Sequence, residues 1–253
     1  MDYVSERPFY GEFAWAYDLL TDRPVARECA WIAATLTERG VGGGARVLDA
    51  GCATGRYAAA LAERGYRVSG VDRSPELLAL ARERRVPCAV ADIAALPLRR
   101  GFGAVLCRGV LNDVLDDESR RAVFRAFATV LGGGGVLVLD VRDWDETVRR
   151  RGADPVHLRT VETARGRLTF RSETRLEPAT RRMVMAERHV LESGGVTHTE
   201  THAFTMRCWT RAELEQRLAE AGFARPECRA AYAEGAPLGA TDRIVAVAGM
   251  LKP

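Results

Sequence analysis

The sequence predicts an α/β protein built on a doubly wound, largely parallel sheet. In the first half of the chain, short apolar runs alternate with segments of helical periodicity, and three of these runs end in an acidic residue, at Asp49, Asp72 and Asp92. Strands that alternate with helices favour parallel βαβ units. Because the carboxyl ends of parallel strands meet at one edge of a sheet, we expect three carboxylates beside a ligand crevice there.

The first unit consists of a strand at 46–50, a turn at 51–55 and an Ala-rich helix from 55 to 64. The turn has the spacing G-x-x-x-G, whereas dinucleotide enzymes carry G-x-G-x-x-G and place a pyrophosphate on the helix N-terminus. Asp49, just before the turn, is a poor neighbour for phosphate and a better one for a cationic or polar ligand. This spacing argues against a nicotinamide oxidoreductase, and the alternative is a turn that only joins a strand to a helix.

The second and third runs place further acidic residues at the same edge. Asp72 ends the run 67–72 and follows Gly51 by 21 residues, a distance that suits a carboxylate that accepts hydrogen bonds from ribose hydroxyls. The third run, 88–91, ends in Asp92 and Ile93.

The segments 47–55, 70–74 and 91–93 resemble the ligand-binding motifs of the class I S-adenosylmethionine-dependent methyltransferases. The resemblance covers roughly residues 10 to 250 and is strongest from 46 to 140. It implies a Rossmann-like sheet of seven strands, S-adenosyl-L-methionine as methyl donor and S-adenosyl-L-homocysteine as product. The glycine turn would hold the methionine part, Asp72 the ribose, and Asp92 with the Ile93 backbone the adenine. The cofactor-binding residues expected are Tyr17, Asp49, Gly51, Cys52, Ala53, Gly55, Asp72, Arg73, Asp92, Ile93 and Cys107.

Composition limits the other classes of protein. No apolar run in the 253 residues approaches the ~18 residues of a membrane span, and the first residues are acidic and mixed, so we expect a cytoplasmic protein. The six cysteines are scattered without metal-ligand spacing, so we expect no metal site. Of the 37 basic residues, 36 are arginines, and they form no stripe that would follow a phosphate backbone, so we expect no nucleic-acid partner.

The N-terminal segment 8–20 contains five aromatic residues on a predicted amphipathic helix. Such a face is typical of core packing. In the resembled family, a similar segment folds over cofactor and substrate, which implies a helical lid over residues 1–40. On that basis we expect Tyr17 at the cofactor and Tyr10 and Trp15 at the substrate; core packing is the alternative.

The remaining core elements follow in order. Helices are expected at 75–85, where Ser74 is the N-cap, at 116–130 and at 211–221. Strands are expected at 103–107, 136–140, 228–233 and 243–250, and the resemblance implies that the last two form a reversed hairpin at one edge. The Rossmann-like core would comprise residues 41–155 and 208–253.

The loop after the fourth strand, 108–113, lacks two features of known methyltransferases. It has no Asn/Asp-Pro-Pro-aromatic stretch, which nucleobase amino methyltransferases carry, and no histidine, which many small-molecule members carry. Asn112 could orient a nucleophile, or it could only cap the next helix. The stretch 140–144 resembles small-amine N-methyltransferases of the glycine and aminosugar kinds. Arg142 could bind a substrate carboxylate or form a structural salt bridge, and we expect Trp144 at the substrate.

Residues 156–207 interrupt the α/β alternation. Three strand-length runs, 167–177, 181–192 and 196–209, predict an antiparallel meander inserted over the substrate pocket. All four histidines lie in this region. His198, Glu200 and His202 share one face of a strand, which predicts a polar cover for the pocket or, less readily, a metal site without a fourth ligand. His202 is the candidate general base.

These features predict a small-molecule N- or O-methyltransferase of natural-product biosynthesis, with a homodimer as one possible assembly. Methyl transfer from a sulfonium needs alignment and exclusion of water, and it needs a base only when the nucleophile must lose a proton. The missing loop histidine therefore favours amines, acidic phenols or carboxylates. The alternative is a protein of the same fold that binds S-adenosylmethionine without transferring its methyl group.

Overall fold

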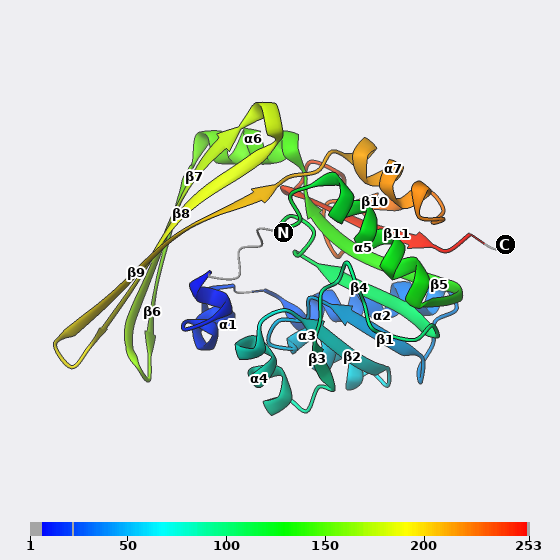
Figure 1. Cartoon of the computed structure of the whole chain (residues 1–253), viewed down its shortest axis with the longest axis horizontal. Coiled ribbons are helices and arrows are strands. Elements are labelled where there is room, and N and C mark those ends of the chain that lie inside the picture. The colour runs from blue at the N-terminus through cyan, green and yellow to red at the C-terminus, as the bar shows by residue number, and fades with distance from the viewer. Residues whose placement is uncertain (1–6, 22, 252–253) are drawn as a thin grey trace.

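The computed structural model, which describes residues 7–21 and 23–251, contains two β-sheets (Figure 1). The larger sheet has seven strands in the order β10-β11-β5-β4-β1-β2-β3. Strands β1 to β5 pair in parallel, and β11 is antiparallel to both β5 and β10. The expected doubly wound sheet with a reversed hairpin at one edge is therefore confirmed. Its strands are β1 (Arg46–Ala50), β2 (Arg67–Asp72), β3 (Cys88–Val90), β4 (Phe102–Arg108), β5 (Leu131–Arg142), β10 (Glu227–Arg229) and β11 (Arg243–Gly249).

Helices cover both faces of this sheet because its central strands present apolar side chains to both sides. In β5, Leu137 and Leu139 pack towards α5 and α7, whereas Val136 and Val138 pack towards α2, α3 and α4. Among the described residues, no helix is long and apolar enough to cross a membrane. The helices are α2 (Val25–Glu38), α3 (Arg56–Ala62), α4 (Pro75–Glu83), α5 (Asp117–Val130), α6 (Trp144–Ala153) and α7 (Arg211–Glu220).

The N-terminal strap, which we define as residues 7–21, differs from the single amphipathic helix expected. It consists of three short turns, η1 (Pro8–Tyr10), η2 (Ala14–Ala16) and α1 (Tyr17–Leu20). Gly11 ends the first turn at φ −130° and ψ −113°, outside the helical region. The strap lies between the two sheets in Figure 1 and packs Phe9 and Phe13 in one apolar cluster with Leu168 and Phe170 of the second sheet.

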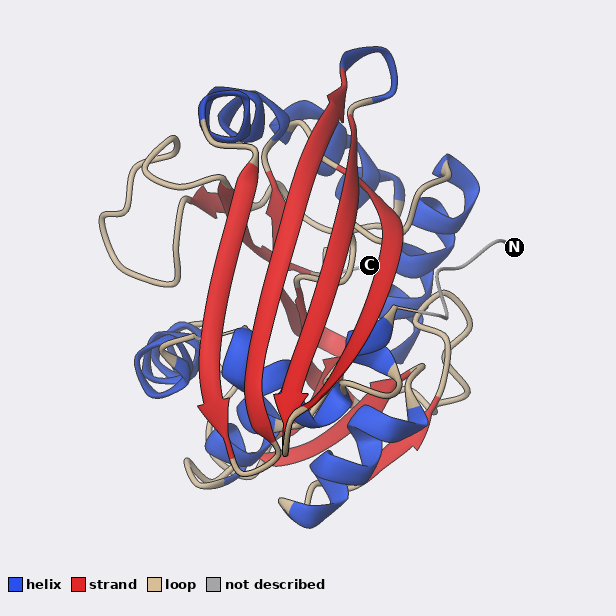
Figure 2. Ribbon diagram, turned by 90° about the vertical axis from the view of Figure 1, so that its left-hand side faces the viewer, coloured by secondary structure: helices blue, strands red, loops and turns tan. Residues whose placement is uncertain are grey.

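The second sheet, the inserted sheet, has four antiparallel strands where three were expected. Figure 2 shows them lying across one side of the core. The additional strand is at an edge and pairs only with its successor. None of its residues is fully buried, and its apolar residues Val156, Leu158 and Val161 do not share one face, so its sequence carries no clear strand signal. The strands are β6 (Val156–Thr163), β7 (Gly166–Glu177), β8 (Arg182–Ser193) and β9 (Val196–Arg207).

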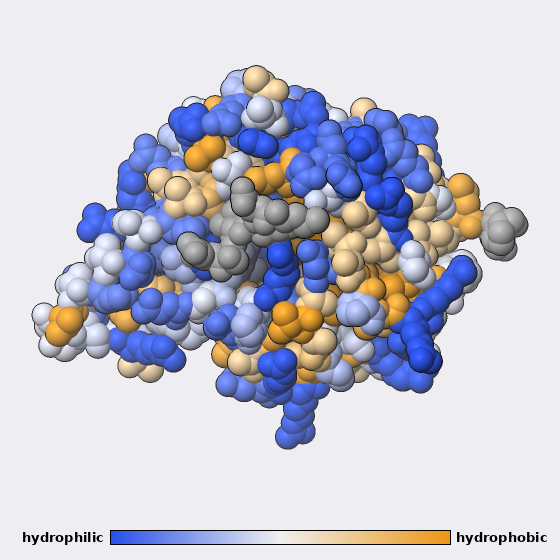
Figure 3. Space-filling view, in the orientation of Figure 1, coloured by the Kyte–Doolittle hydropathy of each residue, from blue (hydrophilic) through white to orange (hydrophobic). Residues whose placement is uncertain are grey.

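The two faces of the inserted sheet have different chemistry. Along β7, Leu168 and Phe170 are buried against the strap, whereas Arg171, Glu173 and Arg175 are exposed on the other face. Arginines and glutamates pair along that outer face, for example Arg171 with Glu173 at 3.0 Å. In the view of Figure 3, the surface over this sheet is largely hydrophilic. The strand periodicity thus separates an inner face that can line a site from a solvated outer face.

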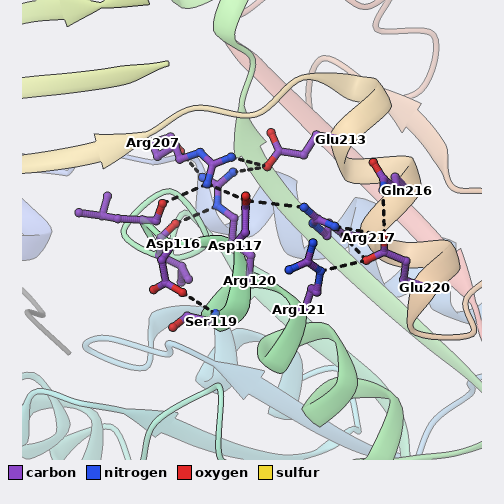
Figure 4. Close-up of polar contacts among 12 residues, drawn as sticks. Asp116, Asp117, Ser119, Arg120, Arg121, Arg207, Glu213, Gln216, Arg217 and Glu220 are labelled. Atoms are coloured by element: carbon purple, nitrogen blue, oxygen red, sulfur yellow. Dashed lines mark hydrogen bonds and ion pairs between the residues drawn. The ribbon is translucent and has the colours of Figure 1, made fainter. Parts of the chain in front are cut away.

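A buried arginine fixes the point where the inserted sheet returns to the core (Figure 4). Arg120 of α5 is fully buried and donates to Glu213 of α7 at 2.8 Å. Its other nitrogens donate to the backbone oxygens of Val114, at 2.9 Å, and of Arg207, at 2.7 Å, and its guanidinium lies 3.8 Å from the ring centroid of Trp209. A single side chain therefore joins α5, α7 and the end of β9.

Loss of this arginine should destabilise the protein strongly. Arg120→Ala leaves buried acceptors without their donor, and we expect the free energy of unfolding to fall by about 3–5 kcal/mol in urea titrations. The matched control is Arg121→Ala, because Arg121 is half exposed and its nearest carboxylate, on Glu220, is 3.6 Å away; its effect should stay within about 0.5 kcal/mol. Equal effects of the two changes would contradict this role.

The turn after β1 packs directly on the loop after β4. Gly51 has φ +79°, and a Cβ atom at this position would lie 2.2 Å from Cγ2 of Val110. Its backbone N–H and that of Cys52 both donate to the oxygen of Val71 at the end of β2, at 2.7 and 2.9 Å. Glycine is required here for two reasons, the left-handed backbone and the close approach of Val110.

The effect of Gly51→Ala on the free energy of unfolding should therefore depend on the side chain at position 110. We expect the single change to lower the free energy of unfolding by about 2–4 kcal/mol, from backbone strain and collision together. Val110→Ala removes the 2.2 Å contact with Cγ2 and leaves only Cβ at 3.2 Å, so the double variant should be more stable than additivity predicts by about 1–3 kcal/mol in a urea-based double-mutant cycle. Strict additivity would show that the collision is relieved in another way.

Candidate functional site

A cavity of about 730 Å³ lies where the carboxyl ends of β1, β2, β4 and β5 meet the N-terminal strap and the inserted sheet. Its volume is within the range of roughly 300–1,000 Å³ found for small-molecule sites. Open α/β sheets bind ligands at this edge. The strap contributes Tyr10 and Tyr17 to the lining, and β6 and β9 contribute His157, Arg159 and Phe204.

Asp72 holds the glycine turn against the start of α4. One of its carboxylate oxygens accepts from the backbone N–H of Ala53 at 2.8 Å, and the other accepts from that of Ser74 at 3.0 Å. Each oxygen keeps a second lone pair, so a ligand hydroxyl can still bind. Burial raises the pKa of Asp72, although these backbone hydrogen bonds oppose that effect. A pair of hydroxyls from the ligand would help to replace the lost solvation.

The next strand end supplies a mixed polar and apolar wall. Asp92 accepts from the backbone N–H of Ala94 at 2.8 Å through one oxygen, and its other oxygen is 4.0 Å from Arg73. Ile93, Leu77 and Val110 add apolar surface to the same lining. This combination fits a planar ring that carries an amino group.

At the centre of the edge, Asp49 and Arg108 offer opposite charges. Burial, with a contribution from Asp72, raises the pKa of Asp49 to about 7, and Arg108 opposes the rise. Arg108 stacks on the ring of Tyr57 and donates to Glu28 at 3.1 Å. Its Nε is buried and has no hydrogen-bond partner among the described residues. A zwitterionic ligand that brings a cation to Asp49 and a carboxylate to Arg108 fits these groups.

The contacts that tie the strap to this ligand edge include two short hydrogen bonds. Ser74, which caps α4 by accepting from the backbone N–H of Leu77, donates its hydroxyl proton to the backbone oxygen of Tyr10 at 2.6 Å. Thr54 in the glycine turn donates to Asp18 of the strap at 2.7 Å. Two short polar contacts thus hold the strap over the site.

The structure brings together most residues expected at the site. Those that line the cavity are Tyr10, Tyr17, Asp49, Gly51, Cys52, Ala53, Asp72, Arg73, Asp92, Ile93 and Arg142. Those outside the lining are Trp15, Gly55, Cys107, Asn112, Trp144 and His202.

The cofactor-binding and aromatic candidates outside the lining pack elsewhere. Gly55 precedes α3 and approaches Ala81 of α4, and Cys107 is fully buried within the sheet. Trp15 lies at the margin of the strap cluster, with Arg165 over its ring. Trp144 packs in a small apolar cluster between α6 and the inserted sheet. Each is a packing residue in this arrangement.

Asn112 and Arg142, two of the catalytic candidates, are linked to each other. The Asn112 side chain accepts from the backbone N–H of Arg142 at 2.8 Å and donates to the oxygen of Gly109 at 3.4 Å. It therefore joins the loop after β4 to the end of β5. Arg142 does line the cavity, and it forms an ion pair with Asp242, which satisfies the structural salt-bridge alternative.

His202, the third catalytic candidate, is not among the residues that line the cavity. It stacks on Phe204 of the same strand, at 6.4 Å between ring centroids, and it is Phe204 that lines the cavity. The polar group expected on this strand forms in part, because His198 lies 3.3 Å from Glu200, and its third member is Glu12 of the strap, also at 3.3 Å, in place of His202. All three side chains are partly solvent-exposed and lie together at the surface.

The lining residues that sequence reasoning missed include Arg7, Arg108, Asp113 and Phe204. Arg7 joins the strap to the inserted sheet, because it binds Glu187 at 2.6 Å and lies 3.8 Å from the ring centroid of Phe204. For Asp113, the available signal was its place in the loop after β4, which was expected to enter the site.

Comparisons with known proteins agree with this geometry. Residues 47–135 match the family model of a methyltransferase domain. A ubiquinone biosynthesis O-methyltransferase from Xanthomonas campestris pv. campestris (strain B100) is 37% identical over 105 residues, which cover 38% of this chain and 42% of that protein. The chain thus aligns with less than half the length of that curated relative.

Solved structures match over nearly the whole chain. An S-adenosylmethionine-dependent methyltransferase from Clostridium acetobutylicum has a TM-score of 0.79 at 19% identity, covering 95% of this chain and 98% of that one. A sugar N-methyltransferase from a Streptoalloteichus species has a TM-score of 0.77 at 23% identity, covering 94% and 93%. Residues 47–135 therefore resemble a methyltransferase domain, and the chain has the fold of the S-adenosylmethionine-dependent methyltransferases, as its motifs predicted.

Proposed function

We propose that this protein is an S-adenosylmethionine-dependent methyltransferase that acts on a small molecule. The observation that carries the proposal is the arrangement of Asp72, Asp92 and the glycine turn around one cavity at the carboxyl edge of the sheet. The match of residues 47–135 to a methyltransferase domain and the methyltransferase fold support it.

In this proposal the cofactor occupies the part of the cavity nearest β1, β2 and β3. Asp72 holds its ribose, Asp92 and the backbone of Ile93 hold its adenine, and Asp49 with Arg108 holds its amino-acid group. When bound, S-adenosylmethionine supplies a methyl group on a sulfonium, whose leaving thioether is neutral. Tyr17 of the strap and the turn Gly51–Ala53 complete this part of the lining.

The substrate would occupy the remaining part of the cavity, under the strap and the inserted sheet. Phe204, His157 and Arg159 line the cavity there, and Tyr10 lies between the two parts. The N-terminal lid of residues 1–40, to which the strap belongs, and the insertion 156–207 are thus proposed as covers over the core segments 41–155 and 208–253. They exclude water and align the nucleophile, which suffices for much of the rate of a displacement with so good a leaving group.

The substrate class is narrower than the fold alone implies. Arg142 lines the cavity, and its Nε is buried without a hydrogen-bond partner among the described residues, so a substrate acceptor such as a carboxylate fits there. The named relatives are a ubiquinone biosynthesis O-methyltransferase and a sugar N-methyltransferase, so either N- or O-methylation is compatible with this proposal. A role in natural-product biosynthesis, a cytoplasmic location and a homodimer stay predictions.

Binding of both cofactor forms tests the site assignment. We expect calorimetry to give saturable binding of S-adenosylmethionine and S-adenosylhomocysteine, and Asp72→Ala to weaken both at least about 100-fold, because a pair of charge-assisted hydrogen bonds is lost. Asp145→Asn, on the exposed first turn of α6, is the control and should bind both normally. Failure of the wild-type protein to bind either form would overturn the proposal.

Turnover separates transfer from binding alone. Incubation with S-adenosylmethionine and panels of amines, phenols and carboxylic acids should release S-adenosylhomocysteine together with a methylated product. Tight cofactor binding with no product from any of the three panels would favour the non-transferring alternative.

The cofactor affinity should depend on pH through Asp49. Its carboxyl group, with a pKa near 7 in the folded protein, is mostly neutral at pH 6 and mostly ionised at pH 8. A cationic ligand prefers the ionised form, so we expect the affinity for S-adenosylmethionine to rise about tenfold from pH 6 to pH 8 in calorimetry. Asp49→Asn carries no charge at either pH and should lose this part of the rise. An unchanged pH profile in the variant would contradict the contact with Asp49.

A further inference from the structure

The loop after β4 ends in Asp113, of whose two carboxylate oxygens only one accepts a hydrogen bond from the described residues. Oδ2 of Asp113 accepts from the hydroxyl of Tyr10 at 3.1 Å. Oδ1 is buried and has no hydrogen-bond partner among the described residues. Asp113 and Tyr10 both line the cavity, and Asp113 lies three residues after Val110, which packs against the glycine turn. This carboxylate is therefore placed between the proposed cofactor and substrate parts of the cavity.

The charged groups around Asp113 are bound to other partners. Arg7, from the strap, forms its ion pair with Glu187 of β8 at 2.6 Å and donates to the Tyr10 hydroxyl at 3.3 Å. Arg142, at the end of β5, is paired with Asp242. Asp72, at the end of β2, also acts on Asp113 through its charge and raises the pKa of Asp113. Neither arginine donates to Oδ1, so a donor from the substrate would complete this site.

We propose that Asp113 is a catalytic residue of this cavity, whose Oδ1 binds the ammonium group of an amine substrate and accepts one of its protons, while Tyr10 holds Oδ2 in position. The inference rests on the proposed methyl-transfer function and deepens it, because it assigns a primary or secondary amine as the substrate and Asp113 as the proton acceptor.

The proton transfer precedes methyl transfer, and charge is conserved at each step. An N–H bond of the ammonium breaks, the proton forms a bond with Oδ1, and the nitrogen keeps the electron pair. That pair then forms the bond to the methyl carbon, while the electrons of the carbon–sulfur bond go to sulfur. The products are the methylated ammonium, S-adenosylhomocysteine and a neutral Asp113 carboxyl group, which releases its proton to water when the product leaves.

The environment suits a carboxyl group that changes its protonation state near neutral pH. Burial raises the pKa of Asp113 to about 6, against the opposing effects of Arg7 and of the hydrogen bond from Tyr10. A base whose pKa is near the working pH accepts and releases a proton efficiently. A carboxylate in the position of the nucleophile would be repelled by Asp113, and an unactivated alcohol is far too weak an acid to give up its proton to this group.

The experiment compares an amine with a neutral alcohol of the same shape. Cyclohexylamine and cyclohexanol are titrated by calorimetry and NMR into the protein loaded with S-adenosylhomocysteine, in which no transfer can occur. We expect the amine to bind at least about tenfold more tightly at pH 7.5. Asp113→Asn should abolish the preference with unchanged affinity for S-adenosylhomocysteine, and Asp145→Asn should keep both. Equal binding of the two probes, or no binding of the amine, would overturn the inference.

The pH dependence provides a second readout that a purely structural role would not change. Amine binding should weaken as the pH falls through about 6, because the carboxylate becomes protonated, and the ¹³C signal of the Asp113 carboxyl group should titrate in the same range. Addition of cyclohexylamine should lower that midpoint, because the ammonium binds the ionised form.

Tyr10→Phe tests the positioning residue and keeps Asp113 in place. Because the Tyr10 hydrogen bond lowers the pKa of Asp113, its loss should move the midpoint of amine binding to higher pH. An unmoved midpoint in this variant, or an absent titration in the wild type, would count against the inference. Since S-adenosylmethionine binding is measured separately, failure of the amine site and failure of the methyltransferase assignment give different results.

Discussion

The geometry of the cavity depends on one buried carboxylate at the end of β5. Asp140 accepts from the backbone N–H of Gly109 at 3.1 Å, from Arg243 of β11 at 2.6 Å and from the hydroxyl of Tyr232 at 2.6 Å. Burial acts against its charged form, but Arg243, Arg23 and Arg108 outweigh it and hold its pKa well below the usual range. A charge removed from water in this way is stable only with several donors. Because the donors come from the loop after β4, from β11 and from the segment between β10 and β11, Asp140 fixes these three parts relative to one another.

That constraint explains why the loop after β4 can carry chemistry. Gly109 is held by Asp140, Asn112 is held by the end of β5, and Val110 lies against the glycine turn. A short loop fixed at three points leaves little freedom for the residue that follows. Asn112 is completely buried and does not line the cavity, so it is not placed to orient a nucleophile there. Because Asn112 is fixed, the next residue, Asp113, has a defined place in the lining.

The parts of the fold and site that were predictable from sequence are those fixed by local patterns. Asp49, Asp72 and Asp92 follow strands whose apolar runs are evident, and parallel strands bring their ends together without further information. Residues whose place depends on distant partners were not predictable. Arg7 meets Glu187 180 residues away, and no local pattern encodes that pair. On β9, periodicity placed His202 on the same face as Phe204, but it could not say where along the strand the cavity ends.

The strap shows why two readings of one aromatic segment were both justified. Phe9 and Phe13 are buried in the apolar cluster with β7, which is the core-packing role. Tyr10 and Tyr17 line the cavity, which is the role of a cover. The break at Gly11 allows both, because three short turns can direct neighbouring side chains to different sides, whereas a continuous helix would direct one face to one surface. The backbone of Tyr10 is bound by Ser74 at the proposed cofactor edge, while its hydroxyl group binds Asp113. One residue of the strap thus connects the two halves of the site through its main chain on one side and its side chain on the other.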